Sequence, residues 1–538
     1  MRLILNILKS MMSNMKKQPN IILLVLDTHR YDRLATYGYQ RHTSPNIDAF
    51  ARQATVFENG ISPAQWTIPS HASLFTGEYP TTHQTIQAHL SLDSRFDTLA
   101  TLLTKHGYNT IGFCNNPLVG ILNNGLKRGF NTFYNYSGAV PSKPRSSNHL
   151  PNPFNSLWEW YTQQLRKVSY PIQNAFARSD FLFRLSLNPL FVPIWTRMFK
   201  FKGDTAQTLR DVRDYLAHVN DTKSDPQFVF INLMETHLPY TPPETFIDKF
   251  APYFKEDRQV RTFMRNYNTQ AFRWLMPMDE RFKEMEFAIL NDMYDSEVAY
   301  QDHLLSELLE FLCRPEIADD TLTIIVSDHG EGLGEHDFMG HSFVAYQELV
   351  HVPLIIKFPQ NNAADKRISN VVSTRRIFHT ILSAAGANIV ESKHRPTTDV
   401  RQLSLARTVQ MPDPENEIVF AEAYAPNTFL SMMETHAPQL IETFHCKVNR
   451  RASFHEHDKL VRVDGVKNEL FNLATDPLEE NNIIHEHPQK ASKLSYKLDS
   501  FMTRAVARRP ENWQANKTLN IEDDETLRQQ LRALGYLE

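Results

Sequence analysis

Short apolar runs rich in β-branched residues alternate with longer amphipathic segments between residues 21 and 358. Four runs predict buried parallel strands, over residues 21–26, 228–233, 322–326 and 353–358. Between them, apolar residues recur at three- and four-residue steps, which predicts helices over residues 46–53, 99–106, 205–218 and 284–313. This alternation predicts an α/β fold in which helices cover both faces of a large, mainly parallel sheet.

The strand and helix alternation fades after residue 401, which predicts a division of the chain. We expect an N-terminal extension (1–18), a large domain (19–400), a smaller C-terminal α+β subdomain (401–500) and a helical tail (501–538). Residues 142–202 are rich in proline, asparagine and aromatic residues and predict an insertion, either a helical cap or a lid with a hydrophobic substrate surface. Further predictions are an antiparallel hairpin (459–463 with 469–472) and a helix (525–534).

Charge and cysteine content narrow the classes of partner and compartment. The 57 lysine and arginine residues nearly balance the 61 aspartate and glutamate residues, so we expect neither nucleic-acid binding nor a polybasic membrane anchor. The three cysteines are odd in number and far apart, which indicates neither a disulfide framework nor a cysteine-zinc site. No signal peptide and no transmembrane segment is expected, so the sequence predicts a cytoplasmic protein. Nothing in it specifies an oligomeric state.

Acidic residues directly follow two of the predicted strands. Asp27 follows residues 21–26, and Asp328 with His329 follows the run that ends at residue 326. Ligands of open α/β sheets bind beyond the carboxyl ends of strands, and carboxylate oxygen and imidazole nitrogen both suit a divalent cation. Taken alone this signal is weak, because Asp27 could cap a helix that begins at Thr28 and His329 could be a hydrogen-bonded loop residue.

A third segment makes the pattern more specific. Residues 63–77 read Pro-Ala-Gln-Trp-Thr-Ile-Pro-Ser-His-Ala-Ser-Leu-Phe-Thr-Gly and resemble the signature of the sulfatase family, with Thr67 at the position of the nucleophile. Further resemblances follow in the family's order, and together they cover residues 19–482. They are the opening strand and first metal loop (19–27), a Ser-Pro-Asn-Ile-Asp segment (44–48), a histidine-bearing segment (235–240), the second metal motif with the strand after it (327–353) and a C-terminal hairpin (469–477).

This resemblance, to the sulfatase branch of the alkaline-phosphatase-like superfamily, implies roles for particular residues. It implies that Asp27, Asp328 and His329 bind a divalent metal, and that Thr67 is both a ligand and the nucleophile. It also implies catalytic roles for His71, His237, His336 and His341, and substrate contacts for His237, His341 and Asn115. Histidine ligation favours Mn²⁺ or Zn²⁺, and Ca²⁺ or Mg²⁺ stay possible.

Departures from the family pattern bear on the substrate. Thr67 replaces the cysteine or serine that is oxidised to formylglycine, and a threonine cannot yield that aldehyde. His71 replaces an arginine, Thr28 an aspartate and His329 an asparagine. The quartet of Asp27, the Thr67 hydroxyl, Asp328 and His329 is instead similar to the branch that contains phosphonate monoester hydrolases and glycerophosphate transferases. We therefore predict a hydrolase of sulfate or phosphate and phosphonate esters, with phosphorus esters favoured and a small-molecule, glycan-linked or lipid-linked substrate. The alternatives are an arylsulfatase-like sulfuric ester hydrolase, a phospho-group transferase and a non-catalytic binding protein of the same fold.

Some of these residues also have structural interpretations. Thr67 and Ser70 could cap a helix from His71, and Ser70 is the favoured cap. Asn115 and Asn116 precede Pro117 and are typical of a turn. His237, His336 and His341 could each be hydrogen-bonded loop residues.

Overall fold

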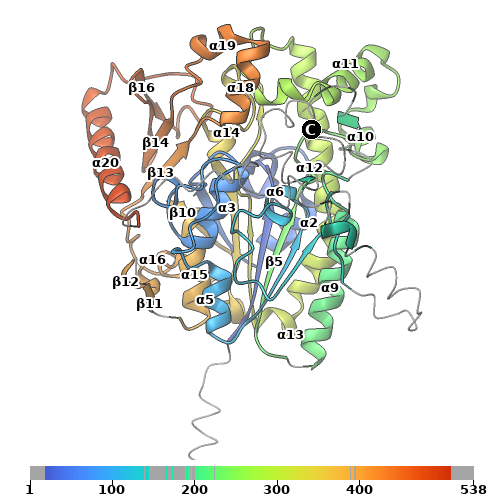
Figure 1. Ribbon diagram of the computed structural model, residues 1–538, viewed down its shortest axis with the longest axis vertical. Coiled ribbons are helices and arrows are strands. Elements are labelled where there is room, and N and C mark those ends of the chain that lie inside the picture. The colour runs from blue at the N-terminus through green and yellow to red at the C-terminus, as the bar shows by residue number, and fades with distance from the viewer. Residues whose placement is uncertain are drawn as a thin grey trace, which may run out of the picture.

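The core of the molecule is an eight-stranded sheet (Figure 1). The structure is a computed structural model that describes residues 18–144 and 200–510, apart from residues 139, 223, 388, 393 and 394. It also describes scattered positions from 162 to 196. The strand order is β10-β2-β9-β6-β1-β5-β3-β4. The strands are β1 (Asn20–Leu26), β2 (Thr55–Ile61), β3 (Asn109–Cys114), β4 (Thr132–Asn135), β5 (Gln227–Leu233), β6 (Thr321–Val326), β9 (His351–Lys357) and β10 (Lys366–Ser373).

Most neighbouring strands of this sheet are parallel, as predicted. β1 lies parallel between β5 and β6, and Val25 pairs with Asn232 on one side and with Val326 on the other. The prediction that residues 353–358 form a parallel strand is wrong in direction, because β9 is antiparallel to both β2 and β6. Apolar content reports that both faces are buried but not which way the strand runs. Here no crossover helix intervenes: after β6 the chain makes the short hairpin β7 (Gly332–Leu333) and β8 (Met339–Gly340) and the one-turn helix α14 (Gln347–Val350) before re-entering the sheet.

Helices cover both faces of the sheet, which confirms the predicted layers (Figure 1). Alternate residues of β1 point to opposite layers, since successive strand side chains alternate. Ile21, Leu23 and Val25 pack in one apolar cluster with α5 (Leu99–Lys105) and α15 (Ile377–Ala384). Ile22, Leu24 and Leu26 pack in a second cluster with α2 (Pro45–Ala51), α9 (Thr205–Thr222) and α12 (Glu284–Cys313).

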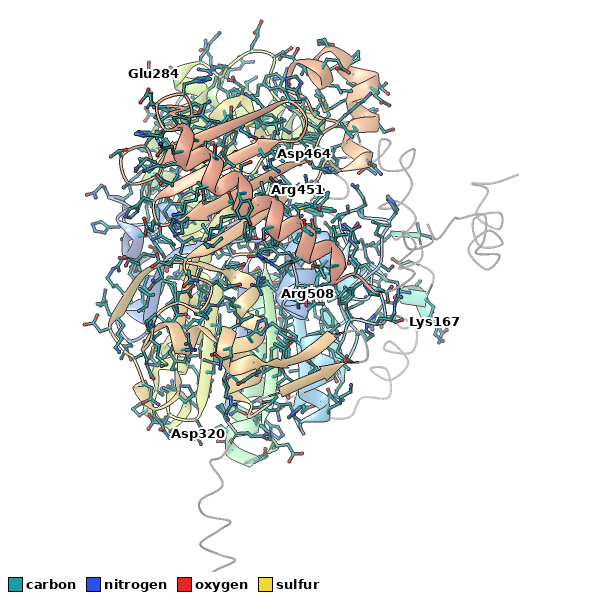
Figure 2. All side chains as sticks on the ribbon, turned by 90° about the vertical axis from the view of Figure 1, so that its left-hand side faces the viewer. Lys167, Glu284, Asp320, Arg451, Asp464 and Arg508 are labelled. Carbon is teal, nitrogen blue, oxygen red and sulfur yellow. The ribbon has the colours of Figure 1, made fainter. Side chains whose placement is uncertain are left out.

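The C-terminal subdomain is a four-stranded antiparallel sheet of order β13-β14-β15-β16 with helices beside it. Its elements are β13 (Ile418–Ala423), α18 (Asn427–His436), α19 (Pro438–Thr443), β14 (Arg450–His455), β15 (Asp458–Val463), β16 (Lys467–Asn472) and α20 (Pro488–Ala507). The predicted hairpin is β15 with β16. Helix α20 lies across one face of the sheet (Figure 2). Because α20 ends at Ala507, the predicted tail boundary at residue 501 falls inside a helix.

The subdomain is joined to the large domain beside the segment that precedes Thr67. The backbone N–H of Glu422, in β13, donates to the carbonyl of Pro63 across 3.0 Å, and Ala64 forms an isolated parallel bridge with Glu422. The end of β13 therefore runs alongside the chain that leads into α3 (Thr67–Thr76).

Other predictions fall on residues that the structure does not describe. They are most of the extension 1–18, most of the insertion 142–202 and the helix 525–534. Within the described part of the chain, no helix combines the length and the apolar character needed to cross a bilayer.

Candidate active site

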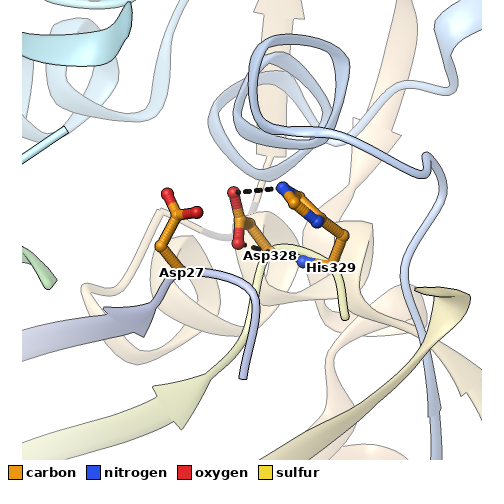
Figure 3. A group of neighbouring side chains, drawn as sticks. All are labelled: Asp27, Asp328 and His329. Carbon is orange, nitrogen blue, oxygen red and sulfur yellow. Dashed lines mark hydrogen bonds and ion pairs between the residues drawn. The ribbon is translucent and has the colours of Figure 1, made fainter. Parts of the chain in front are cut away.

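Asp27 and Asp328 meet at the carboxyl edge of the central sheet. Each follows the last residues of a strand, and the two strands, β1 and β6, are hydrogen-bonded neighbours. One ligand atom from each of Asp27, Asp328 and His329 can be chosen so that all three lie within 4.8 Å of one another (Figure 3). All three side chains are fully buried. The register of a parallel pair thus brings together side chains that are about 300 positions apart in the chain.

The two carboxylates are in an environment that disfavours their charge. Burial raises the pKa of Asp27 to about 6, although a hydrogen bond from Asn116 partly offsets this effect. Burial, followed by the charge of Asp27, raises the pKa of Asp328 well above its usual range. Among the described residues, Oδ1 of Asp27 and Oδ2 of Asp328 are buried without a hydrogen-bond partner. Paired buried carboxylates need a compensating cation, so these residues fit a divalent metal ion.

His329 presents one ring nitrogen to these carboxylates. Its Nδ1 donates to the carbonyl of Gly330 across 2.8 Å, so Nε2 carries the lone pair. Nε2 lies 3.5 Å from Oδ2 of Asp328 and 3.3 Å from Oγ1 of Thr67. Burial lowers the pKa of His329 well below its usual range, so the ring is neutral. A neutral imidazole whose second nitrogen is held by a carbonyl has the form of a metal ligand.

Thr67 is the first residue of α3, and its side chain is buried against this cluster. The expectation that Ser70 caps a helix beginning at His71 is wrong, because the helix begins one turn earlier. Ser70 lies inside the helix, and its Oγ donates to the carbonyl of Asp328 across 2.6 Å. Ser62 donates to the same carbonyl across 2.5 Å. These two hydrogen bonds fix the start of α3 relative to the Asp328 loop.

His71 lies one helical turn after Thr67, on the inner side of α3. Its Nδ1 donates to the carbonyl of Thr67 across 2.9 Å, and its Nε2 accepts from Nδ2 of Asn232 across 3.4 Å. Burial lowers the pKa of His71 to about 4, so the ring is neutral. Both ring nitrogens already have partners, which makes His71 a support of the Thr67 turn in this structure.

His237 and His341 lie beside the cluster. The ring of His341 is centred 4.6 Å from that of His329 and 5.1 Å from that of His237. Burial lowers the pKa of His237 to about 3, and its Nδ1 donates to the carbonyl of Leu238. For His341, burial lowers the pKa, but the negative charge of Glu331 and a hydrogen bond to it outweigh burial and raise the pKa above its usual value. The two histidines thus differ, because burial lowers the pKa of His237 whereas Glu331 raises the pKa of His341.

His336 is not brought into this cluster. Its Nδ1 lies 3.0 Å from Oε1 of Glu348, its Nε2 donates to the carbonyl of Glu479 across 3.4 Å, and its ring stacks on Tyr346 at 3.9 Å between centroids. Burial lowers the pKa of His336, but Glu348 outweighs burial and the pKa rises to about 9. The structure therefore places His336 in a contact between the Glu335–Asp337 turn and the C-terminal subdomain.

The side chain of Asn115 also lies outside this cluster and hydrogen-bonds to two threonines of α9. Its Nδ2 donates to Oγ1 of Thr205 across 2.7 Å, and its Oδ1 accepts from Oγ1 of Thr208 across 2.8 Å. Asn115 therefore anchors the start of α9 to the end of β3. The Asn115 side chain is fully buried, and both its amide nitrogen and its amide oxygen are directed at α9 in this arrangement.

Three residues of the site were not predicted. Nδ2 of Asn116 donates to Oδ2 of Asp27 across 2.5 Å, whereas the sequence indicated only a turn at this position. Asn232 is the last residue but one of β5 and lies against His71, so attention to polar residues near strand ends could have found it. Glu331 contacts His341 across 2.8 Å and lies in the same loop as Asp328. Since β3 was not predicted, nothing in the sequence marked Asn116 as a strand-end residue.

A cavity of about 710 Å³ borders the loop that carries His237. Lys202, Glu235 and Tyr240 line it, and Nζ of Lys202 donates to the carbonyl of Glu235 across 2.7 Å and pairs with Oε1 of Glu297 across 2.8 Å. The cavity offers both charged and aromatic side chains near the candidate site.

Comparison with known proteins identifies related chains. A family model described as Sulfatase matches residues 19–387. The chain is 23% identical over 509 residues to arylsulfatase K of Canis lupus familiaris, a match that covers 90% of this chain and 82% of the relative. It is 22% identical over 402 residues to an arylsulfatase of Clostridium perfringens, which covers 70% of this chain and 76% of the relative.

Solved structures share the fold. A phosphonate monoester hydrolase of Agrobacterium radiobacter superposes with a TM-score of 0.62 at 19% identity and covers 90% of this chain and 96% of its own. A structure described as BT4656 in complex with its substrate D-glucosamine-2-N,6-O-disulfate superposes with a TM-score of 0.59 at 16% identity, covering 93% and 100%. At these identities the likeness shows a common architecture.

Proposed function

The chain belongs to the sulfatase family of the alkaline-phosphatase-like superfamily. We propose that it is a metal-dependent hydrolase of phosphate or phosphonate esters in which Thr67 is the nucleophile. The family match and the relatives make the chain an ester hydrolase of this superfamily. The nucleophile and the metal ligands are inferred from the geometry of the site, and the preferred ester is inferred from the identity of residue 67.

One relationship carries the proposal: Oγ1 of Thr67 lies 3.3 Å from Nε2 of His329, which is clustered with the two buried aspartates. A threonine hydroxyl is a weak nucleophile at its ordinary pKa. Asp27, Asp328 and His329 would hold a divalent ion, which would supply positive charge to lower the pKa of a nearby hydroxyl and to neutralise charge on the transferred group. The chain's own residues hold Thr67 in place through Ser62 and Ser70, so the hydroxyl needs little reorganisation to attack.

The residues around the cluster can bind the transferred group, protonate the leaving group and accept a hydrogen bond from the substrate. Thr67 begins a helix, and the N-terminal end of a helix favours a negatively charged phosphoryl group. His341, held at Nδ1 by Glu331, favours the protonated form and can donate a proton from Nε2 to the leaving alkoxide. His237, which is neutral and donates at Nδ1, has an Nε2 lone pair that can accept a hydrogen bond from the substrate.

The identity of residue 67 supports phosphorus over sulfur. A formylglycine hydrate can expel sulfate from its covalent adduct by means of a second oxygen on the same carbon, and threonine has no such oxygen. If Thr67 is phosphorylated instead, water can attack at phosphorus, which transfers the phosphoryl group to water and returns the Thr67 hydroxyl. A phosphate monoester, which carries more negative charge than a sulfate ester, also matches a divalent ion better than the sulfate ester does.

A sulfuric ester hydrolase is the second candidate, and the names of the relatives favour it. Several are arylsulfatases, and the neighbour BT4656 is described with a disulfated sugar as its substrate. These names support a small-molecule or glycan-linked ester as the substrate in either case. A sulfate ester would have to be hydrolysed at sulfur after transfer to Thr67.

The donor set supports Mn²⁺ or Zn²⁺ over Ca²⁺ or Mg²⁺, because an imidazole nitrogen accompanies the two carboxylates. The three cysteines are all free, and two of them, Cys114 and Cys446, are buried. Free buried thiols agree with a reducing compartment, so we propose a cytoplasmic location.

A substrate panel tests the proposed function. Purified protein supplied with Mn²⁺, Zn²⁺ or Ca²⁺ is assayed against 4-nitrophenyl phosphate, bis(4-nitrophenyl) phosphate, 4-nitrophenyl phenylphosphonate and 4-nitrophenyl sulfate. We expect turnover of phosphorus esters that disappears in Thr67→Ala. Transfer of the phosphoryl group to added glycerol would favour a transferase, and metal binding without turnover of any ester would favour a binding protein.

A further inference from the structure

A second, smaller cavity of about 370 Å³ lies where the C-terminal subdomain meets the segment after α4 (Pro80–His83). Four segments form it: residues 84–87, the chain that leaves β13 and enters α18, the chain that enters β14, and Arg509 just after α20. Its volume is at the lower end of the range for small-molecule sites, roughly 300–1,000 Å³. No role for it follows from the site around Asp27, because none of the proposed metal ligands or histidines lines it.

The lining of this cavity is cationic. Lys447, Arg451 and Arg509 contribute to it, and none of the lining residues that the structure describes is acidic. The side chain of Arg451 is 13% exposed and forms an ion pair with Asp464. Its Nε is buried without a hydrogen-bond partner among the described residues. A guanidinium with an unpaired N–H donor, lying near two further cationic side chains, is suited to bind an anionic group.

The other polar side chains of the cavity suit hydroxyl groups. Asn427 and Asn449 line it, and each amide can both donate and accept a hydrogen bond. Gln84 also lines it, and because its Nε2 donates to the carbonyls of Pro80 and Thr81, it offers its amide oxygen as an acceptor. Apolar lining is limited to Ile86, Ala425 and Leu430, which is too little to desolvate an acyl chain or an aryl group. A ligand that carries several hydroxyls and a negative charge matches this combination, and an acidic sugar residue has both.

Hydrogen bonds from the Gln65 side chain to two backbone carbonyls connect the cavity to the candidate active site. Nε2 of Gln65, two residues before Thr67, donates to the carbonyl of Tyr424 across 2.9 Å and to that of Ser342 across 3.0 Å. Tyr424 lines the cavity, and Ser342 directly follows His341. The cavity wall, the nucleophile segment and the His341 loop therefore meet at a single side chain.

We propose that this cavity binds an acidic sugar residue of the substrate and so directs the enzyme to esters on anionic oligosaccharides. The proposal rests on the proposed ester hydrolase function for its biological meaning. Binding itself does not depend on turnover, which allows the two ideas to be tested separately.

Binding is measured by isothermal titration calorimetry on the full chain carrying Thr67→Ala. The probes are hexagalacturonate, which carries carboxylates, a heparin hexasaccharide, which carries sulfates, and neutral maltohexaose. We expect at least one acidic hexasaccharide to bind about tenfold more tightly than maltohexaose. Equal affinities for acidic and neutral sugars would overturn the proposal.

Two substitutions locate the binding. Lys447→Glu changes a side chain that is 56% exposed and removes only a surface ion pair with Glu434 at 3.5 Å, and Arg451→Gln keeps a polar group at the buried position. Each should weaken binding of the acidic sugar by about tenfold. Lys493→Glu, on the exposed side of α20, is the matched control and should leave affinity within about twofold. Unchanged affinity in both cavity variants, or an equal loss in Lys493→Glu, would show that the sugar binds elsewhere.

Two further probes separate sugars from other anions. Tripolyphosphate supplies negative charge without hydroxyls, and an eight-nucleotide oligothymidylate supplies it on a nucleic acid. If either binds more tightly than both acidic hexasaccharides, the cavity is not a sugar site. Each of these experiments measures binding to the inactive Thr67→Ala variant. If the wild type hydrolysed no ester, the proposed function would therefore be refuted, but the measured binding of acidic sugars would still support this proposal.

Discussion

Nδ1 of His341 donates to Oε1 of Glu331 across 2.8 Å. Glu331 is fully buried, and its second oxygen has no hydrogen-bond partner among the described residues. The carboxylate therefore acts mainly on one imidazole, which it orients and whose protonated form it stabilises. A buried acid that holds a histidine beside a reacting centre resembles a positioning residue of general acid catalysis.

Glu331→Gln tests this relationship. The amide can still accept the hydrogen bond but has no charge, so the pKa of His341 should fall. We expect kcat to drop by about 10- to 100-fold with little change in KM. The loss should grow as the pH rises, because a histidine of lower pKa is deprotonated sooner. A pH profile of kcat with the same shape and height as that of the wild type would contradict the role of Glu331.

Thr67→Ala and Thr67→Ser separate the hydroxyl from the methyl group. The alanine variant should lose nearly all turnover, whereas the serine variant should keep a substantial part, because only the hydroxyl is required. Rapid-quench kinetics with a phosphorus ester should also show a covalent phosphoryl adduct in the wild type. Full activity of the alanine variant would mean that water attacks the ester directly.

Asp328→Ala should abolish metal uptake together with activity, since the wild-type site joins two buried carboxylates that need a cation. Elemental analysis measures the bound metal, and thermal melting with added Mn²⁺ or Zn²⁺ supplies a second readout. Added metal should raise the Tm of the wild type and leave that of Asp328→Ala unchanged. Asp214→Ala, which removes a carboxylate that is 72% exposed, is the control. Unaltered metal content in Asp328→Ala would refute the ligand assignment.

Phosphorus esters should be better substrates than sulfate esters. We expect kcat/KM for a phosphate or phosphonate ester to exceed that for 4-nitrophenyl sulfate with at least one of Mn²⁺, Zn²⁺ and Ca²⁺, since Thr67 offers no second oxygen to expel sulfate. If the aryl sulfate were the best substrate with every metal, the second candidate function would replace the first.

His336 should contribute to stability in a pH-dependent way. Its pKa in the folded protein, about 9, lies above its unfolded value of 6.5. A group with a raised pKa stabilises the fold fully below the unfolded pKa, and this contribution disappears as the pH rises through the folded one. His336→Gln should therefore lower the free energy of unfolding at pH 6, by at most about 3 kcal/mol, and have a smaller effect at pH 9.5. Urea unfolding at both pH values measures this difference, and a loss that is independent of pH would contradict it.

The backbone of the candidate site was predictable from local patterns. Asp27 and Asp328 stand directly after strongly apolar runs, and Thr67 stands in a segment with a recognisable order of residues. Strands β1, β5 and β6 are buried on both faces, so their sequences are nearly continuous apolar runs. Strands β2 and β3 escaped prediction because polar and glycine residues interrupt them, such as Asn59 and Gly60 in β2 and Gly112 in β3.

Tertiary contacts decided the rest. The direction of β9, the separation of His336 from the cluster and the use of Asn115 as an anchor for α9 depend on neighbours that are distant in sequence. The local conformational preferences of a histidine or an asparagine are the same whether its side chain binds a metal, accepts a hydrogen bond from a substrate or anchors another loop. Its role is set by which atoms lie within hydrogen-bonding distance after folding, and local sequence does not encode that distance. Strand ends, in contrast, follow from burial and periodicity, which are properties of the sequence itself.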